Sequence, residues 1–376
     1  MVIIIRSNDI ISDPRAMKYV KYLDDTKQDY YLIGWDREGK MRDSDRVFYY
    51  HHLAGYNVGG MQAVKNRVGW MRFVVKTLRS LSLDKCVLHA CDLDSVFPSV
   101  VYSRLFGRGR EATLIFDVFD WFSATLYDQS WLVLQAFKLM EGISVKNSDY
   151  IVICEAERIE QIPIKIPSNK IKVLPNIPYF SDSGFLRIDE DLKFNNNLIT
   201  FSYVGGFAPT RCLDEIITIA EHGFINLSIA GYGDSQIEQR LIGLNGHPNI
   251  KYYGKVKYTD GLQIMYNSDV IYAMYSKVSP NNVYAAPNKY YEAMFLGKPL
   301  FSTKGTIVEK KVLKNQIGFV SEESEDDIKN EIDMITKEKS LVYAGNAHLL
   351  WVNKYSHYTS DWLINEYQSI IDAAKK

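Results

Sequence analysis

Short apolar runs alternate with segments of helical spacing throughout the first half of the chain. Residues 2–5, 30–33, 86–88, 114–116 and 150–154 form continuous apolar runs that predict buried strands. Between them, residues 14–23, 99–105 and 131–141 repeat apolar side chains with the period of a helix. Apolar strands that alternate with helices indicate a parallel sheet covered by helices on both faces.

A second alternation of the same kind fills the second half of the chain. Its predicted strands are 199–204, 227–230, 250–253, 270–274, 300–302 and 319–320. Two prolines close the first half, and a polar stretch that ends in three asparagines follows them. We therefore predict an α/β fold with two Rossmann-like domains: 1–180, a linker at 181–197, and 198–355. The amphipathic C-terminal helix, 356–376, is expected to pack back on the first domain.

Size and composition restrict the class of protein further. A chain of 376 residues exceeds the usual size of one hydrophobic core, and a hydrophobic content of 47% is that of a soluble globular protein. The net charge of -1 gives no reason to expect nucleic acid as a partner. The four cysteines form no CxxC or Cys/His cluster, and the N-terminus lacks the pattern of a signal peptide. We expect a cytoplasmic protein.

The turn after the first strand of the second half carries two glycines and an arginine, in the sequence YVGGFAPTR at 203–211. Gly205 and Gly206 would let the backbone approach a bulky anion, and Arg211 could contact a diphosphate in a bidentate manner. The motif lacks the GK[ST] ending of a Walker loop and does not match GxGxxG. A plain tight turn is the alternative interpretation.

A short helix near position 290 is the sharpest motif of the chain. Pro287 precedes it and Gly297 follows it, which is the usual punctuation of a helix. Lys289 and Glu292 share a face in its first turns. A cation at a helix N-terminus opposes the helix dipole and so suggests an anionic partner, while the carboxylate could accept hydrogen bonds from a ribose. The alternative is a Lys–Glu pair on the helix surface.

Taken together, the chain resembles the family 4 glycosyltransferases and their relatives with the GT-B architecture, whose two Rossmann-like domains have parallel sheets that face a central cleft. The resemblance covers nearly the whole chain. In the second half it rests on the motifs at 203–211, 227–233, 249–256 and 287–299. In the first half it rests on similar turns at 12–15, 89–94 and 116–121.

The resemblance implies a transferase of the hexosyltransferase type (EC 2.4) that takes a sugar from a nucleotide-diphosphate donor to a glycan or lipid-linked acceptor, in the synthesis of surface polysaccharides or glycoconjugates. A retaining mechanism is expected. Neither a cofactor nor a metal is implied, because cationic side chains and helix N-termini neutralise the leaving diphosphate. An inverting transferase, a sugar-nucleotide epimerase and a non-catalytic partner subunit with the same fold remain as alternatives.

The resemblance also implies roles by position. Gly205, Gly206, Arg211 and Lys289 would hold the diphosphate, and Glu292 the ribose. Two further groups would meet the base and the donor sugar, respectively: Lys255 with Val256, and Asn282 with Tyr284. Tyr284 stands where the family usually has a glutamate that contacts the donor sugar, so Asn281, Asn282 or Tyr284 would have to replace that glutamate.

For the catalytic step, Asp94 and Asp120 both follow predicted strands of the first domain. Either could bind the acceptor hydroxyl or, in an inverting enzyme, act as its base. Phe119 stands where many relatives have a histidine, so the family's role does not carry over directly to this position. Structural hydrogen bonding is the competing interpretation of these aspartates.

The segment 65–79 interleaves five basic residues with apolar ones. From residue 65 onward, the first acidic residue is Asp84. Such a helix favours peripheral contact with an anionic membrane, which would place the protein on the inner face of the cell membrane. The alternative is an ordinary helix whose apolar side packs on the sheet.

Overall fold

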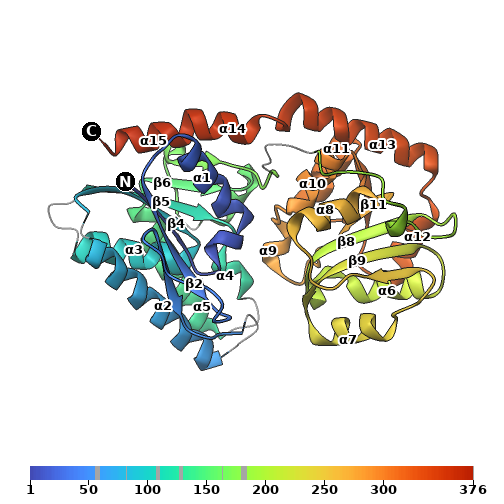
Figure 1. Cartoon of the computed structure of the whole chain (residues 1–376), viewed down its shortest axis with the longest axis horizontal. Coiled ribbons are helices and arrows are strands. Elements are labelled where there is room, and N and C mark those ends of the chain that lie inside the picture. The colour runs from blue at the N-terminus through green and yellow to red at the C-terminus, as the bar shows by residue number, and fades with distance from the viewer. Residues whose placement is uncertain are drawn as a thin grey trace. The chain divides into compact units, whose positions relative to one another are not determined.

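The computed structural model describes residues 1–55, 60–81, 83–106, 111–126, 130–162, 164–178 and 184–375. The chain forms two compact units, each of which is an α/β layer structure (Figure 1). The first unit comprises Met1–Pro175 and the terminal segment Thr359–Lys376, and the second comprises Asn176–Tyr358. The sequence-based prediction of an α/β fold with two parallel sheets is confirmed.

The first unit contains a seven-stranded parallel sheet with the order β3-β2-β1-β4-β5-β6-β7. In that order the strands are Val47–His51, Tyr30–Asp36, Val2–Arg6, Lys85–Cys91, Glu111–Val118, Tyr150–Ile153 and Ile171–Val173. The helices of this unit are α1 (Pro14–Asp25), α2 (Gly60–Leu81), α3 (Leu93–Leu105), α4 (Phe122–Thr125), α5 (Trp131–Asn147) and the terminal α14 (Tyr358–Trp362), η7 (Leu363–Tyr367) and α15 (Gln368–Ala373).

Helices cover both faces of this sheet. One face packs its apolar side chains against α2, α3 and α5, where Trp70, Val74 and Val96 are fully buried. On the other face α1 lies beside the terminal helices (Figure 1), and the rings of Tyr19 and Tyr367 are 4.9 Å apart. The five apolar residues that the sequence places on one face of the terminal helix are all buried: Trp362, Leu363, Tyr367, Ile370 and Ile371.

The second unit contains a six-stranded parallel sheet with the order β10-β9-β8-β11-β12-β13. In that order the strands are Ile250–Tyr252, Asn226–Gly233, Thr200–Phe207, Val270–Ala273, Leu300–Thr303 and Gly318–Ser321. The helices are α6 (Leu213–Glu221), α7 (Ser235–Gly243), α8 (Tyr258–Tyr266), α9 (Pro280–Val283), α10 (Asn288–Leu296), α11 (Ile307–Asn315), α12 (Glu325–Asp333) and α13 (Lys337–Leu350). One apolar cluster joins the sheet to α6, α7 and α12, and another joins it to α8, α10 and α11.

Both sheets are doubly wound: successive strands are added on one side of the first strand, and the later strands are then added on its other side. The reversal lies between β1 and β4 in the first unit and between β8 and β11 in the second. From each such pair of strands, the two chain connections leave on opposite faces of the sheet. In folds of this kind, ligands bind in the crevice that results at the carboxyl ends of the two strands. These two points are therefore where a ligand is expected within each unit.

Several elements differ from the sequence prediction. The edge strands β3 and β7 were not predicted, and α3 begins at Leu93, six residues before the predicted start. The segment expected as a linker, 181–197, falls within the second unit; residues 181–183 lie outside the described part. The described remainder is attached to α8, since the backbone N–H of Arg187 and that of Asp189 donate to the side chains of Gln263 and Asn267.

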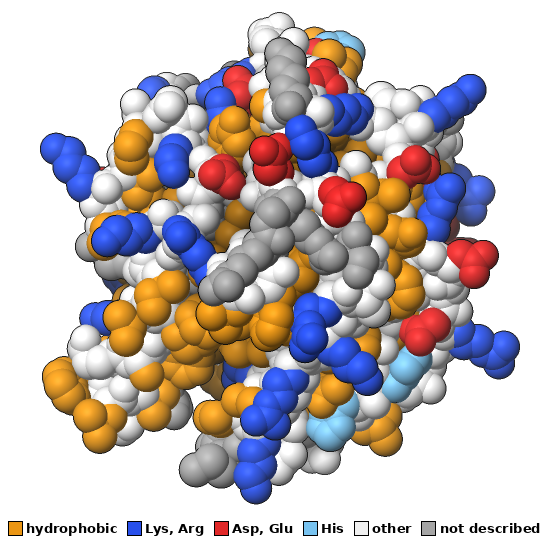
Figure 2. Space-filling view, turned by 90° about the vertical axis from the view of Figure 1, so that its left-hand side faces the viewer, with side chains coloured by type: hydrophobic (Ala, Val, Ile, Leu, Met, Phe, Trp, Pro, Cys, Tyr) orange, Lys and Arg blue, Asp and Glu red, His pale blue; other side chains and the backbone are white. Residues whose placement is uncertain are grey.

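The surface of the first unit retains many apolar side chains. The exposed ones on α2, α3 and α5 include Val64, Val68, Leu105, Trp131, Leu132 and Leu139. Figure 2 shows apolar and basic side chains side by side in the lower half of one face, where acidic side chains are few. In the described part of the chain, no helix has both the length and the apolar character needed to span a membrane. The four cysteines are buried and free.

Candidate functional site

The crevice of the second sheet brings together the loops after β8 and β11. The backbone N–H of Ser276, after β11, donates to the carbonyl of Thr210, after β8, at 2.9 Å. Arg211 ends the short turn η5 (Pro209–Arg211), and its guanidinium carbon lies 4.2 Å from the centre of the Tyr275 ring. The arginine that the sequence singled out therefore lies at the topological switch point.

The two glycines lie inside β8, whereas the sequence predicted a turn after the strand. The strand continues because Gly205 pairs with Gly231 of β9 at very close range. A Cβ on Gly231 would lie 1.8 Å from the carbonyl oxygen of Gly205, so only glycine fits there. The motif is thus a close strand pairing, and β8 continues three residues beyond the predicted end of the strand at 204.

Lys289, in the first turn of α10, is buried and reaches Gly205. A Cβ added to Gly205 would lie 2.9 Å from the Lys289 ammonium, which also sits 4.9 Å from the ring centre of Tyr203. Burial lowers the pKa of Lys289; Glu292 raises it in part, and Arg211 lowers it further. The ammonium is therefore a desolvated cation whose charge is held beside a second cation.

Glu292 lies one turn further along α10 and is 3% exposed. Its Oε1 accepts a hydrogen bond of 2.9 Å from the hydroxyl of Tyr258, at the start of α8. Because Lys289 is only 8% exposed, the two residues do not form the surface pair that was the alternative interpretation. Packing has placed both charges inside the unit at a considerable desolvation cost, which is typical of functional groups.

The guanidinium of Arg211 completes this cationic cluster, which we define as Arg211 and Lys289. Its Nη1 atom is buried and has no hydrogen-bond partner in the described structure. A buried charged donor without an acceptor is costly, and two neighbouring cations repel each other. The cluster is therefore suited to an anion with several acceptor oxygens, such as a diphosphate.

The remaining predicted residues of this unit follow β10 and β11 and differ in burial. Lys255 is exposed, with its ammonium 4.5 Å from the Tyr232 ring centre, and Val256 precedes α8. Asn282 is buried and donates 2.9 Å to the carbonyl of Ser276, which joins it to the loop beside Arg211. Tyr284 is half-buried at the end of α9.

Charged side chains also lie at the switch point of the first unit. Arg6, the last residue of β1, forms ion pairs with Asp13 and with Asp92, which follows β4. Its guanidinium carbon lies 4.1 Å from the centre of the Phe119 ring. The backbone of Asp92 has a φ of 66°, which is uncommon for a residue other than glycine. Its Oδ1 accepts a hydrogen bond of 2.9 Å from the backbone N–H of Phe119.

Asp92 is a residue that the sequence analysis missed. Desolvation raises its pKa to about 6, Arg6 opposes this shift, and the nearby Asp120 and Asp94 add to it. The three aspartates therefore share one electrostatic environment. The available sequence signal was a charged residue at the end of β1, Arg6, and one directly after β4, Asp92.

The two aspartates predicted to be catalytic differ in their surroundings. Asp94 lies in the first turn of α3, is partly buried, and has a buried Oδ1 with no hydrogen-bond partner in the described structure. Asp120 is 61% exposed, and its Oδ1 lies 3.4 Å from Nη2 of Arg158. Asp94 is therefore the better placed of the two to accept a further hydrogen bond.

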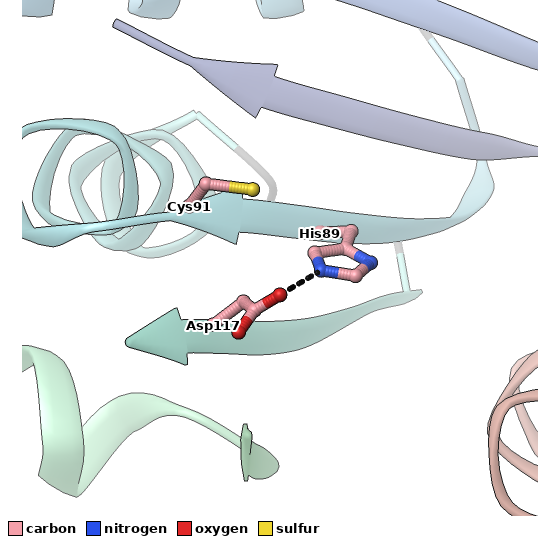
Figure 3. Close-up of side chains that lie close together, drawn as sticks. All are labelled: His89, Cys91 and Asp117. Carbon is pink, nitrogen blue, oxygen red and sulfur yellow. Dashed lines mark hydrogen bonds and ion pairs between the residues drawn. The ribbon is translucent and has the colours of Figure 1, made fainter. Parts of the chain in front are cut away.

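A second polar cluster lies deeper in the first unit (Figure 3). Among the described residues, His89, Cys91 and Asp117 form a group close enough to share a metal ion. However, Asp117 already accepts from Arg15 at 2.6 Å, from Tyr19 at 2.9 Å and from His89 at 3.2 Å. Burial also raises the pKa of Cys91, which disfavours the thiolate that a metal needs. The geometry is that of an internal ion pair.

The sequence matches no protein-family model and no curated protein. Its structure is similar to sucrose-phosphate synthase from Thermosynechococcus elongatus, with a TM-score of 0.74, 12% identity and 99% coverage of both chains. It is also similar to Anabaena HepE, solved in complex with UDP-glucose (TM-score 0.67, 14% identity, coverage 98% and 99%). A third similar structure is WaaG, a glycosyltransferase of lipopolysaccharide biosynthesis (TM-score 0.63, 10% identity, 99% of both chains). The fold of this chain is that of the GT-B glycosyltransferases.

Proposed function

We propose that the chain is a glycosyltransferase whose second unit binds a nucleotide-diphosphate sugar. The observation that carries this proposal is that two cations, Arg211 and Lys289, lie close together at the switch point. The Nη1 atom of Arg211 is buried there and has no hydrogen-bond partner in the described structure. An anionic diphosphate would supply the missing acceptor and relieve the repulsion between them.

The neighbouring groups fit the other parts of such a donor. Glu292 is an acceptor of the kind that can bind a ribose diol, because a carboxylate has about four lone-pair sites, one of which takes the bond from Tyr258. Backbone near Lys255 and Val256 would meet the base, and Asn282 with Tyr284 would lie toward the sugar. The Gly205 and Gly206 backbone would accompany the phosphates.

We base a finer proposal on the two cations and on the family resemblance. Two protein cations can neutralise a leaving diphosphate, so a metal-independent reaction is proposed. We further propose a retaining hexosyltransferase that acts on a glycan or lipid-linked acceptor in surface polysaccharide or glycoconjugate assembly. Anomeric analysis of the product by NMR distinguishes this from an inverting transferase, and turnover of the donor to its epimer without an acceptor would reveal an epimerase.

Nucleotide binding tests the proposal directly. In a thermal-shift screen of UDP, GDP, ADP, CMP and dTDP, we expect one nucleotide to raise the melting temperature of the second unit by about 5–10 °C when present at about 100 times its dissociation constant. UDP is the first choice, because the structural neighbour HepE was solved with UDP-glucose. If none of the five stabilises the protein, the donor site is refuted. Nucleotide binding without any transfer or hydrolysis would favour the alternative of a non-catalytic partner subunit. That alternative is considered because Tyr284 stands where the family usually has a glutamate.

For the transfer step we propose that Asp94 binds the acceptor hydroxyl, or takes its proton in an inverting enzyme. Asp94→Asn is expected to slow transfer by about 100-fold at saturating donor, a typical effect of losing one acid–base group. Asp120→Asn should change the rate far less, because Asp120 is exposed and paired with Arg158. Equal losses in both variants, measured by single-turnover kinetics, would contradict this assignment.

A further inference from the structure

Helix α2 has two apolar stripes, one fully buried in the core and one only partly buried. Trp70, Val74 and Leu78 lie three and four residues apart, are at most 1% exposed, and pack on the sheet. A second stripe, turned toward α3, contains Val68, Met71 and Val75, of which Val68 is 41% exposed. The alternative interpretation of this helix, packing on the sheet, thus accounts for the first stripe. In the second stripe Met71 also contacts the core, whereas Val68 is exposed and Val75 is partly exposed.

The second stripe forms one wall of an open groove. The facing wall belongs to α3 and consists of Phe97, Pro98 and Val101. The cavity measures about 340 Å³ and is lined mainly by apolar side chains. A groove of this size and character, open on the surface, is the shape that a hydrocarbon chain fills.

Cations accompany the groove along its length. Arg72, Lys76 and Arg79 belong to its lining and are all exposed. Over the whole of Gly60–Leu81 there is no acidic residue, so all the charged side chains of α2 are positive. On the facing helix, Arg104 adds a further positive charge near the end.

The apolar surface continues beyond the groove at the end where α2 and α3 both finish. The guanidinium carbon of Arg79 lies 4.5 Å from the ring centre of Phe106, which is 40% exposed, and the adjacent Leu105 is 65% exposed. Apolar side chains next to basic ones are the combination by which proteins adhere to anionic bilayers. A protein partner of acidic character would match the cations but would give no reason for an apolar groove beside them.

We propose that this groove docks the chain on an anionic membrane by taking up a lipid acyl chain, while Arg72, Lys76 and Arg79 bind the phosphate headgroups. The inference adds a defined lipid site to the membrane contact expected from the sequence. It does not depend on nucleotide binding, because all the residues involved belong to α2 and α3 of the first unit.

Vesicle sedimentation tests the charge component. The full chain should bind vesicles that contain phosphatidylglycerol and should bind pure phosphatidylcholine vesicles weakly. The variant R72E/K76E/R79E is expected to bind the anionic vesicles roughly 100-fold more weakly, because each basic residue near such a surface contributes about a factor of five. The matched control is K310E/K314E/K337E, which reverses three exposed lysines of the second unit and changes the net charge equally. Equal losses in both variants would overturn the proposal.

A spin label tests the acyl component. Val68→Cys offers an exposed thiol, whereas the four native cysteines are buried. On anionic vesicles, the label is expected to become accessible to oxygen and protected from a water-soluble relaxation agent. A label at Leu313→Cys, on the second unit, should stay exposed to water. If the protein binds vesicles while the Val68 label also stays in water, the cations act alone and the groove holds no lipid chain.

Discussion

The variant Lys289→Met/Arg211→Met is expected to bind the nucleotide diphosphate on the order of 1000-fold more weakly than the native chain, because each charge-assisted hydrogen bond that is lost contributes about 1.5–3 kcal/mol. Isothermal titration calorimetry with the nucleotide found in the thermal-shift screen measures this loss. A matched variant, Lys310→Met, removes an exposed lysine of α11 and should leave the affinity unchanged.

Stability and affinity should move independently in the single variant Lys289→Met. Burial and Arg211 both lower the pKa of Lys289, so its charged form is unfavourable in the free protein. Replacing it by an apolar side chain of similar length removes the repulsion from Arg211 and the attraction to Glu292 together, so the free energy of unfolding should change little, although ligand binding is lost. A residue with a merely structural role would lose stability on the same change.

The pH dependence provides a second readout of the same lysine. A lowered pKa means that the ammonium gives up its proton at a lower pH than an ordinary lysine does, and an anion binds the charged form. Affinity for the diphosphate should therefore fall as the pH rises through this lowered pKa. In Lys289→Met this dependence should be absent. A native chain whose affinity is independent of pH in the alkaline range would contradict a direct contact between Lys289 and the phosphates.

Much of the fold could be predicted because its central strands are continuous apolar runs. The strands β1, β4, β5 and β11 are buried on both faces, and their positions follow from hydrophobicity alone. The edge strands were missed since β7 is three residues long with a lysine at its centre, and β3 is only partly buried. Burial drives the sequence pattern, so strands that lack it leave little trace.

The candidate site was predictable where its residues are charged and lie in punctuated motifs, as with Lys289, Glu292 and Arg211. Their partners were not, because Tyr258 and Tyr275 reach them from segments far apart in sequence and belong to a residue type that is abundant here. The left-handed backbone of Asp92 has no signature in the sequence either. Contacts between distant segments are set by the tertiary fold.

Breaking the buried ion pair between Arg15 and Asp117 is expected to destabilise the first unit strongly. The two side chains are 6% and 0% exposed and 2.6 Å apart, and Arg15 also donates to the carbonyl of Leu174. Asp117→Asn removes the negative charge and leaves the guanidinium buried without its counter-ion, which is expected to cost about 3–5 kcal/mol. Urea denaturation followed by circular dichroism at neutral pH measures this loss.

The sign of the pH effect and a double variant separate charge from packing. Burial alone would raise the pKa of Asp117, but Arg15 and the hydrogen bond from His89 hold it below its ordinary value. Its stabilisation is therefore complete above the unfolded pKa of about 3.9 and declines as the pH falls below that value. Asp25→Asn, which removes an exposed pair with Lys21, should cost less than about 1 kcal/mol. The variant Arg15→Met/Asp117→Asn should recover part of the loss, since it removes the buried cation and keeps a side-chain carbonyl as acceptor for Tyr19 and His89; if it is as unstable as Asp117→Asn, then packing rather than charge is responsible.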